Sequence, residues 1–239
     1  MSRRSAQLEM RLRPAPRWGG WREKAGRKKD PASGMSHLRR QGFSSTMPSH
    51  VTVRLMPDLQ SLRTATLVRA LGRTFAAGCA RPDFRLVHYT LLGNHAHLIV
   101  EAQSPDALGR GMMSIGSRLA LAVNRVMGRK KGRVVADRYH SRALRTPKEV
   151  RNALRYVLLD ARKHATVTAR ATRRAMEVVL DPASSARWFD GWKLKGHAGP
   201  SAFEDAAALE SCPVARARTW LLRVGWRRHG LLDPADVPG

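Results

Sequence analysis

Hydrophobic and polar residues follow two distinct periods along most of the chain. Apolar and polar residues alternate over 51–55, and this period of two is typical of a half-buried strand. Between residues 59 and 79 the apolar residues recur every three or four positions, which predicts an amphipathic helix. Residues 84–92 and 95–101 are rich in strand-forming residues, and the Gly-Asn pair between them indicates a hairpin turn.

Helix and strand patterns continue to alternate after the hairpin. The Ser-Pro pair that opens residues 104–127 is typical of a helix start, and the apolar spacing after it is helical. Residues 133–144 are expected to hold one or two short strands. The Thr-Pro-Lys-Glu sequence at 146–149 combines an N-cap, a first-turn proline and a capping-box glutamate, which predicts a helix over 147–165.

The predicted order of elements is therefore β-α-β-β-α-β, followed by a further helix. This order is that of the ferredoxin-like split βαβ fold, an α+β architecture in which two helices cover one face of a four-stranded antiparallel sheet. Such a fold hosts many unrelated functions, so the function must be argued from particular side chains.

Composition narrows the class of protein. The chain has 239 residues, of which 43% are hydrophobic, enough for a globular core. It contains no uninterrupted apolar stretch long enough for a membrane span. Its two cysteines exclude a disulfide-rich secreted scaffold and a cysteine-based zinc finger.

Charge indicates the kind of partner. The formal net charge is +26 and the sequence pI is about 11.7, which favours a polyanion, most often a nucleic acid. Residues 1–48 hold twelve Lys or Arg and three acidic residues, a net charge of +9, with few apolar residues and no period. We therefore expect this segment to be a disordered basic tail.

The segment 171–239 carries four of the six tryptophans. The favoured interpretation is that these rings pack a C-terminal extension onto the domain. The alternative is a surface of aromatic and arginine side chains on which nucleic-acid bases stack.

His95 and His97 are the first candidates for chemistry. Alternate residues of a strand point to the same side, so both imidazoles can converge on one metal ion. The alternative is that both are ordinary strand residues, and the pair alone does not decide between these interpretations.

The helix predicted over 147–165 adds a hydroxyl and a carboxylate. Tyr156 and Asp160 lie one turn apart and off the apolar stripe of this helix, so they share one flank. Together with the two histidines they make a candidate nucleophile and a third metal ligand. A surface tyrosine beside a solvated aspartate is the alternative. Tyr139 is a rival nucleophile, although it has no carboxylate one helical turn later.

Four segments resemble the HUH single-strand tyrosine transposases. Asn94–Val100 resembles their Asn-His-x-His-hydrophobic strand, and Arg138–Ser141 resembles the segment before their catalytic helix. Leu154–Lys163 resembles their tyrosine helix, and Ser184–Ala186 resembles a signature of the REP-associated branch. The resemblance covers about residues 50–190.

The resemblance implies a nuclease domain over residues 49–170 that nicks and rejoins single-stranded, hairpin-forming DNA. Tyr156 would be the nucleophile that forms a 5′-phosphotyrosine, and His95, His97 and Asp160 would hold Mg²⁺ or Mn²⁺. Such an enzyme works in the cytoplasm at the nucleoid, with no membrane, as a monomer or a homodimer. The basic residues expected to contact DNA phosphates are Arg138, Arg142, Arg145, Arg155, Arg162 and Lys163.

Two positions depart from the family pattern, and they leave open the alternative of a protein of this fold without catalytic activity. Leu92 and Gly93 stand where members often have Met-Pro, and Ala161 follows Asp160 where many have Asn-Pro. The alternative is an inactive module of the same fold that binds nucleic acid through charge. It predicts salt-sensitive binding without metal dependence.

Overall fold

The computed structural model describes residues 43–168, 180–193 and 212–236, and side chains within the first range up to residue 160. The predicted basic tail lies almost entirely outside the described residues. The described strands are β1 (Ser49–Arg54), β2 (Phe84–Leu91), β3 (His95–Ala102) and β4 (His140–Ala143). The helices are α1 (Ala65–Ala76), α2 (Pro105–Val126), α3 (Pro147–Thr168), the 3₁₀ turn η1 (Ala186–Trp188), α4 (Trp220–Arg223) and the 3₁₀ turn η3 (Gly225–His229). Among these helices, none is both long enough and apolar enough to cross a membrane.

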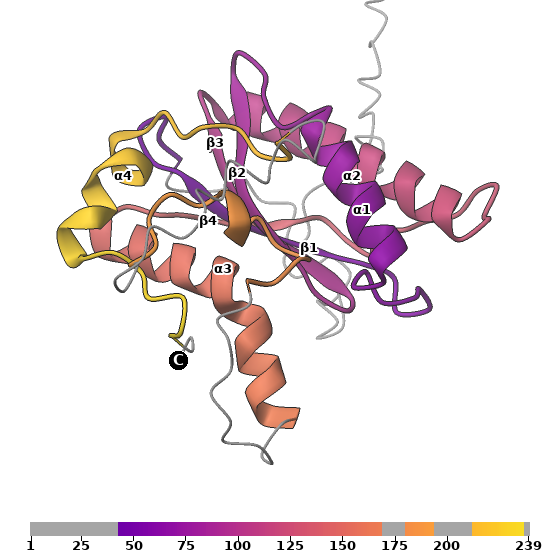
Figure 1. Cartoon of the computed structure of the whole chain (residues 1–239). Coiled ribbons are helices and arrows are strands. Elements are labelled where there is room, and N and C mark those ends of the chain that lie inside the picture. Colours follow the sequence, from indigo (N-terminus) through magenta and orange to yellow (C-terminus); the bar gives the residue numbers. More distant parts are fainter. Residues whose placement is uncertain (1–42, 169–179, 194–211, 237–239) are drawn as a thin grey trace, which may run out of the picture. The chain divides into compact units, whose positions relative to one another are not determined.

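The four strands form one antiparallel sheet in the order β2-β3-β1-β4. β1 is paired on both sides, because Ser49 lies opposite Val100 of β3 and Ala143 of β4. Figure 1 shows the sheet between α1 and α2 on one side and α3 on the other. The predicted α+β class with a split βαβ order is therefore confirmed, including the additional helix.

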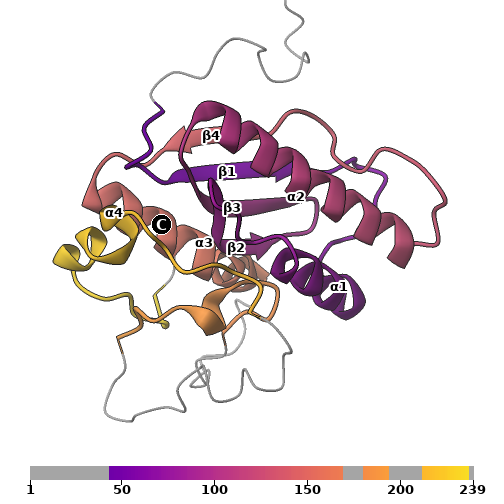
Figure 2. The same cartoon turned by 90° about the horizontal axis from the view of Figure 1, so that it is seen from above.

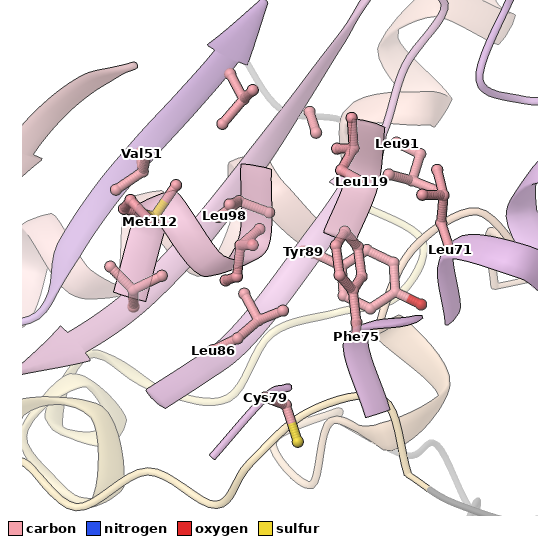
Figure 3. Packing of buried hydrophobic residues seen from close by; sticks show 14 of the residues in the cluster. Val51, Leu71, Phe75, Cys79, Leu86, Tyr89, Leu91, Leu98, Met112 and Leu119 are labelled. Atoms are coloured by element: carbon pink, nitrogen blue, oxygen red, sulfur yellow. The ribbon is translucent and has the colours of Figure 1, made fainter. Parts of the chain in front are cut away.

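Each face of the sheet has its own hydrophobic core. One core joins α1 and α2 to alternate residues of β1, β2 and β3. Figure 3 shows Phe75 of α1 against Tyr89 of β2, and Met112 of α2 near Leu98 of β3. The other core joins α3 to the opposite side chains, such as Ile99 of β3. The strand alternation thus divides the molecule into two layers of helices around one sheet, also seen from above in Figure 2.

The helix expected over 59–79 is shorter than predicted. α1 begins after Thr64, whose hydroxyl accepts a hydrogen bond from the backbone N–H of Leu67. Before that cap, the backbone N–H of Leu62 donates to the carbonyl of Gly93 at 3.0 Å and ties this segment to the hairpin. Leu62 is buried by this turn and not by a helix, which explains why the apolar pattern predicted too early a start for the helix.

The described C-terminal segments pack against α3 and β2. The backbone N–H of Leu91 donates to the carbonyl of Ala183, and that of Ser185 to the carbonyl of Tyr89, so 181–185 runs beside β2. Trp226 is buried in the core of α3, with its ring 5.4 Å from that of Phe189. Aromatic side chains therefore hold these segments to the α3 face of the sheet.

Packing between α2 and β2 predicts that alanine substitutions at two glycines of α2 change the stability of the protein in opposite directions. A Cβ at Gly111 would overlap the ring of Phe84, whereas one at Gly116 would meet no atom within 4 Å. We expect Gly111→Ala to lower the free energy of unfolding by about 1–3 kcal/mol. Gly116→Ala should raise it by about 0.5–1 kcal/mol, since alanine is the better helix former. Urea unfolding of both variants measures this, and equal effects of the same sign would contradict the packing.

Burial of His88 predicts a loss of stability in mild acid. Its Nδ1 lies 3.2 Å from Oγ of Ser185, its ring packs edge-on against Phe189, and burial lowers its pKa from 6.5 to about 3. The unfolded chain binds this proton below about pH 6.5 and the folded chain does not, so stability falls as the pH falls. Between about pH 7 and pH 5 this histidine alone accounts for roughly 2 kcal/mol.

Urea unfolding at both pH values should therefore show a steeper decline for the wild type than for His88→Gln. The comparison isolates His88, because the other histidines titrate equally in both proteins. Parallel declines would mean that the ring of His88 is protonated within the folded protein.

Candidate active site

Two strands and one helix bring the predicted chemical side chains to one face of the sheet. His97 of β3 lies opposite Thr52 of β1, and Tyr156 projects from α3, which packs on this face. His95 and His97 are two positions apart on β3, with ring centroids 4.8 Å apart. The strand alternation thus puts both imidazoles on the same side of the sheet.

His97 is held by neighbours at both ring nitrogens. Its Nδ1 lies 3.1 Å from Oγ1 of Thr52 and 3.2 Å from Nε2 of His50, and its Nε2 lies 3.2 Å from Oη of Tyr156. Burial, together with the adjacent imidazoles of His50 and His95, lowers the pKa of His97 to about 3. The ring is therefore neutral at neutral pH. When its Nδ1–H donates to Thr52, the lone pair is on Nε2, the nitrogen that faces Tyr156.

His95 is oriented by the residue before it. Its Nδ1 lies 2.8 Å from Oδ1 of Asn94, and an amide oxygen only accepts hydrogen bonds. Nδ1 therefore carries the proton and Nε2 carries the lone pair. Metal-binding histidines are oriented in this way, with one nitrogen donating to an acceptor and the other binding the ion.

Tyr156 lies against the histidines and is half-buried. Its ring packs edge-on against His97 at 5.0 Å and against His50 at 5.8 Å between centroids. Burial raises the pKa of Tyr156, and the negative charge of Asp160 raises it further. The phenol is consequently protonated at neutral pH and can donate its hydrogen bond to Nε2 of His97.

Asp160 is buried one turn after Tyr156, with 1% of its surface exposed. Its charge also raises the pKa of Arg63, after the larger contributions of the hydrogen bond and ion pair that Arg63 makes with Asp181. Within the part of the chain that the structure describes, no group of three His, Cys, Asp or Glu side chains is arranged to hold a metal ion. The structure thus brings the two imidazoles together, and the role of Asp160 as a third metal ligand remains a prediction.

His50 also belongs to this cluster, although no motif in the sequence predicted a role for it. Burial, then the charges of Arg142 and His140, lower the pKa of His50 to about 4, so this ring is also neutral. Its place follows from β1, where residues that alternate with the buried Val51 point toward α3. That alternation was visible in the sequence, but the register that sets His50 beside His97 was not.

Tyr139 and Arg138 lie apart from the histidines. Tyr139 packs against the core of α1 and α2, and both residues line a groove beside α2. The structure therefore places the rival nucleophile on the side of the sheet away from Tyr156.

The other predicted phosphate contacts fall in different places. Arg142 is exposed on β4 opposite His50, so it borders the histidine cluster. Arg145 is exposed beyond the end of β4, and Arg155 of α3 forms a 3.7 Å ion pair with Asp236. Arg162 and Lys163 belong to the part of α3 whose side chains lie outside the described residues.

Comparison with known proteins finds a distant likeness in fold. No family model matches the chain, and no curated protein matches it. Among solved structures, the chain is similar to a REP-associated tyrosine transposase bound to a REP hairpin, with 22% sequence identity and a TM-score of 0.41. The similarity covers 56% of this chain and 77% of that chain.

Proposed function

We propose that this chain nicks single-stranded DNA through Tyr156 and rejoins it by strand transfer. The observation that carries the proposal is the 3.2 Å approach of Oη of Tyr156 to Nε2 of His97, on the face of β3 that also holds His95. A phenol beside paired imidazoles is a nucleophile next to groups that can bind a cation or take a proton. The likeness of four sequence segments to the HUH transposases supports the same assignment.

The chemistry is an exchange of one phosphodiester bond for another. Oη of Tyr156 attacks phosphorus, the Oη–P bond forms, and the bond from phosphorus to the 3′ oxygen breaks. The phenol passes its proton to water, and water returns a proton to the departing 3′ oxygen, so the step is neutral overall. The 5′-phosphotyrosine conserves the energy of the original bond, so a 3′ hydroxyl can later displace the tyrosine without ATP.

The raised pKa of Tyr156 indicates that its phenol needs a nearby cation to lose its proton. Burial and the charge of Asp160 raise the pKa of its phenol, which opposes the loss of the proton. A cation near Oη would reverse that balance. Neutral imidazoles at His95 and His97, with an oxygen ligand at Asp160, are donors that Mg²⁺ or Mn²⁺ accepts. A bound divalent ion supplies charge stabilisation at the scissile phosphate.

The charge of the chain and access to the site favour a polyanionic substrate, and the resemblance to the HUH transposases narrows it to single-stranded DNA. A net charge of +26 favours a polyanion, and Arg142 stands exposed beside the histidine cluster. We propose single-stranded DNA next to a hairpin as the substrate, bound by a monomer or a homodimer.

Binding without chemistry is the second candidate function. The specific observation in its favour is that the described residues hold no group of three metal-ligating side chains. In that case the fold would hold DNA through its basic side chains, and affinity would depend on salt but not on divalent ions.

A covalent adduct tests the nucleophile. Wild-type protein with Mn²⁺ and a labelled single-stranded hairpin DNA should give a band of protein-linked DNA on a denaturing gel. Tyr156→Phe should abolish this band, because no other group replaces the phenol oxygen. Tyr139→Phe is the matched control and should retain it, since Tyr139 packs on the α2 side. An undiminished band from Tyr156→Phe would overturn the proposal.

Loss of the proposed ligands tests the metal. His95→Ala, His97→Ala and Asp160→Asn should each lower the rate of adduct formation by about 100-fold or more, the scale on which one charge-stabilising group acts. EDTA should stop the reaction and Mn²⁺ should restore it in the wild type. Thermal unfolding identifies any variant that has lost its fold. Adduct formation that persists in EDTA would refute the metal requirement, and binding without any adduct would favour the second candidate.

A further inference from the structure

A groove crosses the end of the sheet where β1 and β2 begin and β3 and β4 end. Its volume is about 590 Å³. The side chains that matter in its lining are Arg85, Glu101, Arg145, Arg218 and Trp220. We call it the sheet-end groove, and none of the chemistry proposed for Tyr156 uses it.

Glu101 builds one wall of the groove. Its carboxylate is buried and accepts hydrogen bonds from the backbone N–H groups of Arg218 and Thr219, each at 2.8 Å. It also accepts one from the hydroxyl of Thr219 at 2.7 Å. These three bonds fix the start of α4 against the end of β3. The backbone that bears Arg218 and Trp220 is therefore held in place.

Trp220 presents an ordered indole to solvent. Trp220 is 48% exposed, whereas Trp226 on the next turn is 1% exposed. The ring lies so close to Gly225 that a Cβ there would be 2.7 Å from Cζ3 of the indole. The guanidinium of Arg228 lies 4.9 Å from the ring centroid. Gly225 and Arg228 thus hold the indole in place, and because Arg228 covers one face of the ring, a ligand would stack on the other face.

Three arginines around this ring keep their charge available. Among the described residues, no carboxylate forms an ion pair with Arg85, Arg145 or Arg218. The nearby Asp83 pairs with Arg110 at 2.7 Å. Glu101 keeps its negative charge, because its donors are neutral backbone and hydroxyl groups, but the three arginines outnumber it. The groove is therefore cationic around an aromatic surface.

We propose that the sheet-end groove binds single-stranded DNA, with one unstacked base on Trp220 and the adjoining phosphates on Arg145 and Arg218. A stacked platform with guanidinium groups beside it matches a base attached to a phosphate. Duplex DNA would satisfy the arginines but not the indole, because its bases are already stacked. An acidic peptide would likewise leave the indole without a partner.

The groove lies within reach of the candidate active site, and this role rests on the proposed function. Glu101 is four residues beyond His97 on the same side of β3, roughly 13 Å at about 3.3 Å per residue. Tyr156 is nine residues after Pro147, roughly 14 Å along α3 at about 1.5 Å per residue. One continuous strand can therefore occupy the groove and pass Tyr156.

Binding of a fluorescent single-stranded dT oligonucleotide, followed by anisotropy, tests the groove. Trp220→Ala should weaken binding by about 5- to 100-fold, the range for loss of one base stack, whereas Trp220→Phe should retain most of the affinity. Arg145→Ala and Arg218→Ala should each reduce the salt dependence by about one phosphate contact. Arg223→Ala is the matched control, because Arg223 is exposed on α4 but does not line the groove.

A second readout separates stacking from a change in folding. Binding of the oligonucleotide should quench tryptophan fluorescence in the wild type, and Trp220→Phe should lose part of that quenching while binding and thermal unfolding stay close to wild type. Unchanged affinity in Trp220→Ala and Arg218→Ala would overturn the inference. So would equal competition by duplex DNA or by a poly-glutamate peptide.

The outcome is distinguishable from that of the proposed function. Oligonucleotide binding is measured in EDTA, in which the proposed nicking does not proceed, so it reports on the groove separately from the chemistry of Tyr156. If Trp220→Ala weakens binding but the wild type forms no adduct, the groove stands and nicking fails. If the adduct forms and the groove variants bind normally, nicking stands and the groove fails.

Discussion

The contact between Nε2 of His97 and Oη of Tyr156 joins residues that are 59 positions apart in the sequence. It depends on how α3 is rotated about its own axis. Val150, Leu154, Val157 and Leu158 are buried against the sheet and the C-terminal segments, which fixes that rotation. Tyr156 precedes Val157 and therefore projects at the flank of the buried stripe, toward β3. The candidate site thus exists because the apolar face of α3 packs on the same side of β3 to which His97 points.

The environment of this contact favours neutral side chains. The pKa values of His50 and His97 are lowered and that of Tyr156 is raised, with burial as the first cause in each case. Asp160 is buried one helical turn after Tyr156, and its negative charge opposes ionisation of the phenol. A phosphate group that enters such a site adds negative charge, so chemistry there requires a cation close to Oη. Under the proposed function, His95 and His97 would supply donors for such a cation.

Local patterns predicted most of the fold, because the strand and helix periods are properties of short segments. The start of α3 at Pro147 and the pairing of β2 with β3 followed from the residues themselves. The late start of α1 did not, since the contact of Leu62 with Gly93 is made between distant segments. For the same reason His50 was missed: its alternation was visible, but its neighbour His97 depends on the register of β1 with β3. Asp160 was predicted from helix geometry to be a third metal ligand, and its distance to the histidines depends on packing that no local pattern encodes.

The register of β3 places the candidate active site and the sheet-end groove on the same face of the sheet, the face that α3 covers. His97, Ile99 and Glu101 alternate with residues of the other core, so all three point away from α1 and α2. A shift of β3 by one residue would turn both His97 and Glu101 into that core and remove the support of Tyr156 and of α4 together. The irregular pairing in the sheet lies on β2, between Leu86 and His88, and β1 pairs with β3 without interruption. The regular β1–β3 ladder is therefore the structural element on which both the candidate active site and the sheet-end groove depend.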